Sequence, residues 1–234
     1  MRWLNELDHQ AKPGSDTPAA PTVYIVDDDL SVRESLDALI RFEGWQVETF
    51  ATAADFLNRP PVLLPGCLVL DLALPGLSGL DLQKRIAVEC GHLPIIFITG
   101  HGDVPTTVQA MKAGAIEFLT KPFDHGVLLR AIPNAIERSQ HALEQAAQQR
   151  ELEDRYASLS RREREVMALV VAGLLNKQVA WELGISEITV KAHRGQAMRK
   201  MQAGSLAELV TMAARCQLAP PEKRLAFPPA AVAG

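Results

Sequence analysis

Carboxylate, hydroxyl and amine side chains recur in this chain at the ends of short apolar segments. The acidic run 27–29 (DDD) follows one such segment, Asp71 and Thr99 end two others, and Lys121 follows a fourth. Carboxylates held close together are unfavourable unless a cation neutralises them. Oxygen ligands suit a hard divalent ion, and Mg²⁺ is the usual ion where a phosphoryl group is also bound. The pattern therefore predicts a Mg²⁺ site.

These residue types indicate phosphoryl transfer. An Asp carboxylate can attack phosphorus and form an aspartyl phosphate. The reaction needs in-line positioning and charge neutralisation more than acid–base catalysis, and Mg²⁺, the Lys121 ammonium and the Thr99 hydroxyl would supply these. Each residue alone has an ordinary explanation, because an Asp after a strand is commonly a helix cap. All of them in order, each at a strand end, favour a site.

The elements that must position these residues alternate along the chain. Five apolar segments, 22–27, 46–50, 67–71, 94–99 and 116–119, have the character of buried strands. Helical patterns lie between them, for example near 53–58, 78–89 and 104–113. This alternation predicts an α/β fold with a flavodoxin-like, doubly wound, five-stranded parallel sheet. Ligands of such sheets bind at the carboxyl ends of the strands.

A small all-α domain is expected after the sheet. Ser160 and Glu163 fit a capping box at a helix start. Asn176 is expected to cap a second helix, and Ser186 a third over 187–201, with a final helix near 205–216. A helix, a glycine-containing turn and a further helix are typical of a helix-turn-helix domain. The apolar residues of the third helix that should face inward are Val190, Ala197 and Met201.

The expected organisation has two domains between two tails. The expected segments are a flexible tail 1–21, the α/β domain 22–140, a helical linker 141–155, the helical domain 156–218 and a disordered tail 219–234. Pro133 is expected to kink or split the helix that precedes the linker, because proline removes the bond to the Leu129 carbonyl.

Composition limits the classes of function. Of the 234 residues, 47% are apolar and 22% charged, which is typical of a globular protein. We find no apolar run long enough for a membrane span and no secretory signal, and three scattered cysteines favour a reducing cytoplasm. Residues 155–218 hold ten Lys/Arg and five Asp/Glu, against twelve and twenty-two in residues 1–154. The basic part is the candidate for DNA binding.

Three runs, VDDDLSVR, LDLALPGLSGLDL and ITGHGDVPTTVQAMKAGAIEFLTKPF, together resemble the receiver domain of two-component response regulators, most closely the FixJ subfamily. The resemblance covers about residues 22–140 and implies that Asp71 accepts the phosphoryl group. The implied Mg²⁺ ligands are Asp28, Asp71 and the backbone carbonyl of Ala73, with Asp27 acting through water.

The same resemblance implies three further roles. Thr99 and Lys121 would engage the phosphoryl group, and Phe118 would be the switch aromatic, although a buried strand aromatic fits it equally. Ala73 departs from the family, which often has a larger or polar residue there. Pro133 puts the family's usual dimer face in doubt.

The segment from LSRREREV to SLAELV resembles the LuxR-type helix-turn-helix domain, over roughly residues 156–218. It implies that residues 187–201 form a recognition helix in the major groove. We expect Lys191 and Arg194 to lie near bases. The residues expected nearer phosphates are Thr189, His193, Arg199 and Lys200. The expected DNA-contacting set is Thr189, Lys191, Ala192, His193, Arg194, Gly195, Arg199 and Lys200.

The expected function is phosphorylation-dependent control of transcription in the cytoplasm, without an enzymatic role beyond slow autodephosphorylation. The implied partners are a sensor histidine kinase, double-stranded promoter DNA, a second copy of the phosphorylated chain and RNA polymerase, with no membrane. Three alternatives stay open at this point. They are a haloacid dehalogenase-type phosphatase, disfavoured because Ala73 replaces its second Asp, a DNA-binding protein with an idle receiver, and a sigma-factor-like promoter-recognition domain.

Overall fold

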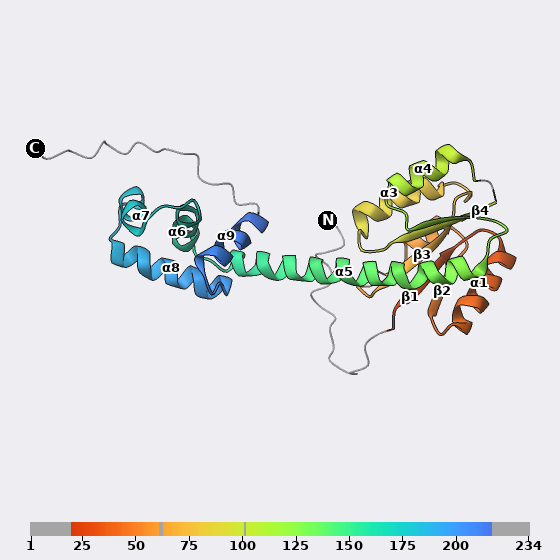
Figure 1. Cartoon of the computed structure of the whole chain (residues 1–234), viewed down its shortest axis with the longest axis horizontal. Coiled ribbons are helices and arrows are strands. Elements are labelled where there is room, and N and C mark those ends of the chain that lie inside the picture. Colours follow the sequence, from red (N-terminus) through yellow and green to blue (C-terminus); the bar gives the residue numbers. More distant parts are fainter. Residues whose placement is uncertain (1–19, 61–62, 101, 217–234) are drawn as a thin grey trace, which may run out of the picture. The chain divides into compact units, whose positions relative to one another are not determined.

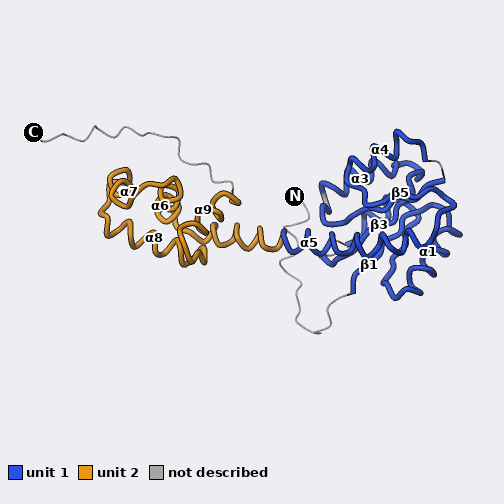
Figure 2. Tube along the Cα trace, viewed as in Figure 1, with its two compact units in different colours: residues 1–145 blue, residues 146–234 orange. Residues whose placement is uncertain are grey.

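The computed structural model describes residues 20–60, 63–100 and 102–216. The chain divides into two compact units, residues 1–145 and 146–234 (Figure 2). The tails expected at 1–21 and 219–234 lie outside the described residues, except for positions 20 and 21.

The N-terminal unit contains a five-stranded parallel sheet with the order β2-β1-β3-β4-β5 (Figure 1). The strands are β1 (Thr22–Val26), β2 (Gln46–Phe50), β3 (Gly66–Asp71), β4 (Ile95–Thr99) and β5 (Glu117–Thr120). The strand order reverses between β1 and β3, so the doubly wound sheet predicted from the alternation is confirmed. Their carboxyl ends meet at one edge of the sheet, where a ligand site is expected.

Helices cover both faces of this sheet. They are α1 (Leu30–Phe42), α2 (Ala53–Leu57), α3 (Gly79–Glu89), α4 (Val104–Lys112) and α5 (His125–Ala157). Alternate strand residues point to opposite faces: Ile25 and Val69 pack with α1 and α5, whereas Val26 and Leu70 pack with α2, α3 and α4. Both faces are apolar, so the strands are almost continuous hydrophobic runs.

Pro133 does not divide the helix that contains it, and the expectation of a split was wrong. α5 continues from His125 to Ala157 through Pro133. Pro133 is exposed, whereas Ile132 and Ala135 beside it are fully buried against the sheet. Burial of the neighbouring turns therefore holds the helix together despite the missing hydrogen bond. Among the described residues, no helix is both long and apolar enough to cross a membrane.

The C-terminal unit contains four further helices among its described residues. They are α6 (Arg161–Val171), α7 (Asn176–Leu183), α8 (Glu187–Met201) and α9 (Leu206–Arg215). The capping box of Ser160 and Glu163 is present at the start of α6, as predicted. Val190, Ala197 and Met201 are each 0% exposed, as predicted for the inner face of α8. Leu152, near the end of α5, is buried in one of the cores of this unit.

Asn176 does not cap α7, which corrects another expectation. It is the first helical residue, and the N-cap position belongs to Leu175, whose backbone N–H donates to Gln178 Oε1 at 2.8 Å. The Asn176 side chain instead accepts a hydrogen bond from Arg194 Nη1 at 3.3 Å. Asn176 thus joins α7 to α8, because a partner distant in sequence competes with the local cap.

Candidate functional site

Three carboxylates gather at the carboxyl edge of the sheet. Asp27 and Asp28 follow β1, and Asp71 ends the neighbouring strand β3. Each offers an oxygen, and these oxygens all lie within 4.8 Å of one another. Asp27 is fully buried and Asp71 is 7% exposed, whereas Asp28 is exposed. The site therefore has a buried floor and one carboxylate at its mouth.

Lys121 brings a positive charge to this cluster from the end of β5. Its Nζ donates to Asp27 Oδ2 at 2.6 Å and to Asp71 Oδ2 at 3.2 Å. Its backbone N–H donates to the Thr99 carbonyl oxygen at 2.7 Å, which ties the end of β5 to that of β4. The strand-end residues that the sequence predicted as one site are thus brought together across the sheet.

The pKa values of the pair reflect both burial and contact. Burial raises the pKa of Asp27 above its ordinary value, and hydrogen bonds from Lys121 and the Asp29 backbone only partly offset this. Burial acts to lower the pKa of Lys121, but the hydrogen bonds and charges of Asp27 and Asp71 outweigh it and raise that pKa. The ammonium therefore stays protonated at neutral pH and balances part of the acidic cluster.

The third residue of the acidic run has a different role. The Asp29 carboxylate accepts the Ser31 N–H at 2.8 Å and caps α1. Its backbone N–H donates to Asp27 Oδ1 at 2.9 Å, so the turn also orients Asp27. Hydrogen bonds from the backbone N–H groups of Ser31 and Val32 lower the pKa of the Asp29 carboxyl. Asp27 and Asp28 are left for the site.

The donor set fits a hard divalent cation. Ions such as Mg²⁺ take carboxylate and carbonyl oxygens, usually with one or two protein carboxylates and several waters. Asp28 is exposed, and Ala73, whose carbonyl is the other expected ligand, is exposed as well. The Ala73 N–H donates to Asp71 Oδ1 at 3.2 Å, which orients the carboxylate toward the loop. Oxygen chemistry and access to solvent both suit Mg²⁺.

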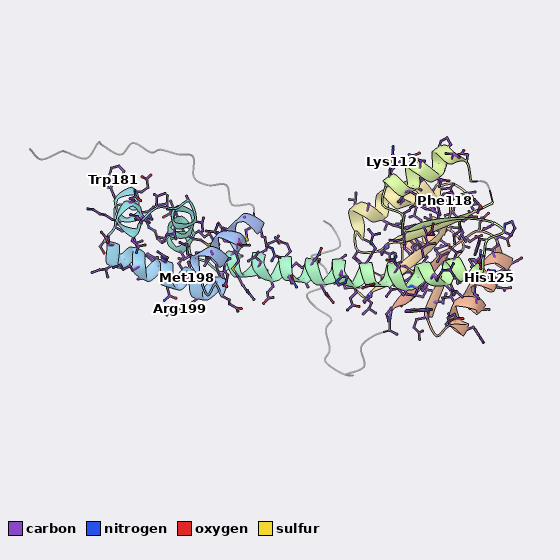
Figure 3. All side chains as sticks on the ribbon, viewed as in Figure 1. Lys112, Phe118, His125, Trp181, Met198 and Arg199 are labelled. Atoms are coloured by element: carbon purple, nitrogen blue, oxygen red, sulfur yellow. The ribbon has the colours of Figure 1, made fainter. Side chains whose placement is uncertain are left out.

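Thr99 and Phe118 lie on adjacent strands beside this cluster. Thr99 is 0% exposed at the end of β4, next to Asp71 of β3 in the sheet. Phe118 lies on β5 (Figure 3) and is half-buried. Its ring centroid is 6.0 Å from that of Phe97. A β-carbon at Gly102 would lie 3.1 Å from Phe118 Cε1 and 2.7 Å from Thr120 Cγ2. The loop after β4 therefore packs directly on the aromatic ring, a contact that sequence reasoning missed.

The second candidate site is the exposed side of α8. Lys191, Ala192 and Arg199 are exposed, and Arg199 projects from the C-terminal half of the helix (Figure 3). Half-buried members of the predicted DNA-contacting set are Thr189, His193, Arg194, Gly195 and Lys200. The predicted residues thus differ in how freely they can reach a ligand.

Three of these side chains already have partners within the unit. Thr189 Oγ1 lies 2.8 Å from Ser186 Oγ, and Arg194 Nη1 donates to Asn176 Oδ1. Lys200 Nζ donates to Glu163 Oε2 at 2.7 Å and to the Ser158 carbonyl at 3.2 Å. Lys200 therefore contributes to the packing of α6 and α8, a role that its sequence neighbours did not indicate.

Ile188 is an exposed apolar residue on α8 that sequence reasoning left out. It lies in the first turn of the helix and is 80% exposed. Its position in the sequence could have indicated a place beside the predicted DNA-contacting residues. Ile188 is three and four residues before Lys191 and Ala192, and residues with this spacing share a helical face.

Comparison with known proteins gives two matched families. Residues 23–133 match the response regulator receiver domain, and residues 157–213 match the bacterial regulatory proteins of the luxR family. Nodulation protein W of Bradyrhizobium diazoefficiens is 50% identical, covering 81% of this chain and 84% of that protein. Transcriptional regulatory protein FixJ of Azorhizobium caulinodans is 44% identical, covering 87% and 96%. The solved response regulator StyR is 48% identical, with a TM-score of 0.73 over 84% of this chain and 100% of that one.

Proposed function

The chain belongs to the response regulators of two-component systems, in the FixJ subfamily, and we propose that its Asp71 is the residue that accepts the phosphoryl group. It is thus a phosphorylation-dependent transcriptional regulator, with a receiver domain and a LuxR-type DNA-binding domain. The family consists of regulators, not enzymes. The observation that best supports Asp71 is its contact with Lys121 inside the acidic cluster.

Phosphorylation at this site is a transfer between two side chains. An Asp71 carboxylate oxygen attacks the phosphorus of a phosphohistidine on the sensor kinase, so that a P–O bond forms as the P–N bond breaks. The Lys121 ammonium would form an ion pair with one oxygen of the new phosphoryl group, and the Thr99 hydroxyl would donate a hydrogen bond to another. Asp28, Asp71 and the Ala73 carbonyl would hold Mg²⁺, with Asp27 acting through water. Bound Mg²⁺ would neutralise charge on the phosphoryl oxygens.

We propose that the signal then spreads through Thr99 and Phe118. The phosphoryl group adds up to about two negative charges and several acceptor oxygens. Movement of Thr99 toward it opens space in front of Phe118, whose ring turns inward and alters the loop that packs on it at Gly102. A change from 1:99 to 99:1 between two states needs about 5.5 kcal/mol of differential stabilisation.

The surface that responds would include α4. Three of its apolar residues, Val104, Val108 and Met111, are 76%, 45% and 42% exposed, and their spacing places them on one face. We propose that this face pairs with the same face of a second phosphorylated chain. A dimer would favour two half-sites about one helical turn apart on the DNA.

The DNA-binding domain would place α8 in the major groove. Lys191 and Arg194 are proposed to approach base edges, with Thr189, His193 and Arg199 nearer phosphates. Lys200, held by Glu163, would reach a phosphate only by exchanging that partner. Contact with DNA and a kinase, and with RNA polymerase at the promoter, implies a cytoplasmic location. Slow loss of the phosphoryl group to water would reset the protein.

The test is intact-mass analysis after incubation with acetyl phosphate, with Mg²⁺ or with a chelator. We expect one added phosphoryl group on the wild type with Mg²⁺ and none on Asp71→Asn. Asp29→Asn is the matched control, because Asn also caps helices and Asp29 lies outside the site. Phosphorylation of the Asp71→Asn variant would contradict the assignment.

A further inference from the structure

Ile188 is exposed far beyond what packing of the C-terminal unit accounts for. Burying an isoleucine side chain contributes about 1.5–3 kcal/mol, yet 80% of Ile188 is exposed. Among the described residues it belongs to neither apolar core of this unit. A side chain of this kind does not help the domain to fold, so its apolar surface needs another explanation.

The register of α8 places Ile188 on a face with a distinct composition. Ile188, Lys191, Ala192 and Gly195 follow the spacing of a single helical face, which we call the 188–195 face. Val190, Ala197 and Met201 are fully buried and define the opposite side. Lys191 and Ala192 are exposed, and a β-carbon at Gly195 would meet no atom of the described residues within 4 Å. Crowding inside the unit therefore does not require a glycine at position 195.

This face suits close approach to the floor of a groove. The side chain of Ala192 is small and Gly195 has none, so the helix backbone can come close to the base edges. Lys191 supplies a cation beside them. The hydroxyls of Ser186 and Thr189 at the helix start lie 2.8 Å apart and pair with one another. The Ile188 side chain has no hydrogen-bond donor, so this side chain cannot bind a phosphate. What it offers is an apolar surface at the end of the helix that meets base edges.

We infer that Ile188 is a specificity-determining residue, which contacts the C5-methyl group of a thymine in the major groove. The thymine methyl is the apolar group that base pairs present there. This inference rests on the proposed function, because it requires α8 to be the recognition helix. It adds to that function a stated base preference at the position that the first turn of α8 meets.

The experiment removes that methyl group and nothing else. A duplex is selected from a random library with the phosphorylated full-length chain, and each thymidine of one half-site is replaced in turn by deoxyuridine, which keeps the base pair. We expect one replacement to weaken wild-type binding about fourfold, which corresponds to about 0.8 kcal/mol for a buried methyl-sized group. Ile188→Ala should bind both duplexes equally.

A matched control separates this effect from a general loss of apolar surface. Val210 on α9 is 42% exposed, and Val210→Ala should keep the fourfold preference. Thermal unfolding should show that both variants fold like the wild type, because neither side chain belongs to the apolar cores found among the described residues of this unit.

The possible results distinguish the inference about Ile188 from the proposed function. A thymine preference that Ile188→Ala loses and Val210→Ala keeps supports the inference. Specific binding with no methyl-sensitive position, or a preference that survives in Ile188→Ala, overturns it and leaves the proposed function standing. If Ile188→Ala only weakens capture of RNA polymerase, the surface meets protein and the inference is wrong. Failure of the wild type to select any duplex overturns both statements.

Discussion

Gly79 packs so closely on the backbone of Asp71 that a β-carbon at position 79 would lie 2.7 Å from the Asp71 carbonyl oxygen. The same β-carbon would lie 2.9 Å from Leu72 Cα, and the Gly79 N–H donates to the Leu72 carbonyl at 3.1 Å. Gly79, the first residue of α3, therefore packs against the backbone of the proposed phosphoacceptor and restricts its position.

We expect Gly79→Ala to destabilise the receiver domain by about 1–3 kcal/mol, the usual range for overpacking, and to slow phosphorylation by acetyl phosphate. Urea unfolding and intact-mass time courses would measure the two effects. Gly100→Ala is the control, because a β-carbon there would meet none of the residues that the structure describes within 4 Å. Equal stability of the two variants would show that the contact with Asp71 is relieved at little cost.

Loss of the Lys121 ammonium should affect both stability and switching. Lys121→Met leaves Asp27, which is fully buried, without the cation that lies 2.6 Å away. A buried charged group deprived of its partner costs about 1–3 kcal/mol or more. We expect that loss in urea unfolding at pH 7, and a smaller one when Asp27→Asn is also present. Additive effects of the two substitutions would contradict direct coupling between the side chains.

The contact between Glu163 and Lys200 predicts a pH dependence. The hydrogen bond from Lys200, then that from the Ser160 backbone, lowers the pKa of Glu163 below its ordinary value of 4.5. A carboxyl with a lowered folded-state pKa stabilises the fold above its unfolded-state pKa, and this contribution disappears as pH falls through the folded-state value.

We therefore expect Glu163→Gln to destabilise the DNA-binding domain by about 1 kcal/mol at pH 7, with a difference that shrinks below about pH 4.5. Gln still accepts in a capping box, so the variant removes mainly the charge. Thermal unfolding between pH 3 and pH 7 measures this. A difference that is constant across that range would assign the effect to packing.

Gly195→Ala should separate folding from recognition. Alanine is about 0.8–1.0 kcal/mol more favourable than glycine in a helix interior, and within the described part of the chain a β-carbon at position 195 meets nothing within 4 Å. We expect the variant to melt at a higher temperature and to bind its selected DNA more weakly, because the added methyl group projects from the 188–195 face. Unchanged DNA affinity would mean that this part of α8 stays clear of the groove.

Replacement of Pro133 should strengthen α5. Pro133→Ala restores a donor to the Leu129 carbonyl at an exposed position of a continuous helix. Proline destabilises a helix interior by about 3 kcal/mol. It also restricts the unfolded chain, which stabilises the folded state by up to about 1 kcal/mol and offsets part of that loss. We expect the receiver domain to gain about 1–2 kcal/mol in urea unfolding. A loss of stability would indicate that the helix bends at Pro133 to fit the sheet.

Periodic patterns predicted most of the fold. The buried strands and the inner residues Val190, Ala197 and Met201 follow from regular spacing, because an apolar face must be covered. Convergence of Asp71, Thr99 and Lys121 could also be foreseen, since the carboxyl ends of parallel strands share an edge. These inferences need no knowledge of individual contacts between distant residues.

The remaining features depend on such contacts. Lys200 meets Glu163 across 37 residues of chain, and Arg194 holds Asn176 away from a capping role. Pro133 sits in an unbroken helix because its neighbours are buried. Local preference favoured a capping role for Asn176 and a break at Pro133, and contacts with distant residues overrode both.

Residues 140–151 of α5 include no buried residue. Side-chain hydrogen bonds four residues apart, Gln140 to Glu144 and Gln149 to Glu153, are among the interactions that support this stretch. Such pairs contribute only about 0.2–0.5 kcal/mol each, so these backbone amides should open without unfolding of either core. In hydrogen exchange these amides should exchange faster than those of the two cores on either side, and a protease should cut this stretch before it cuts either core.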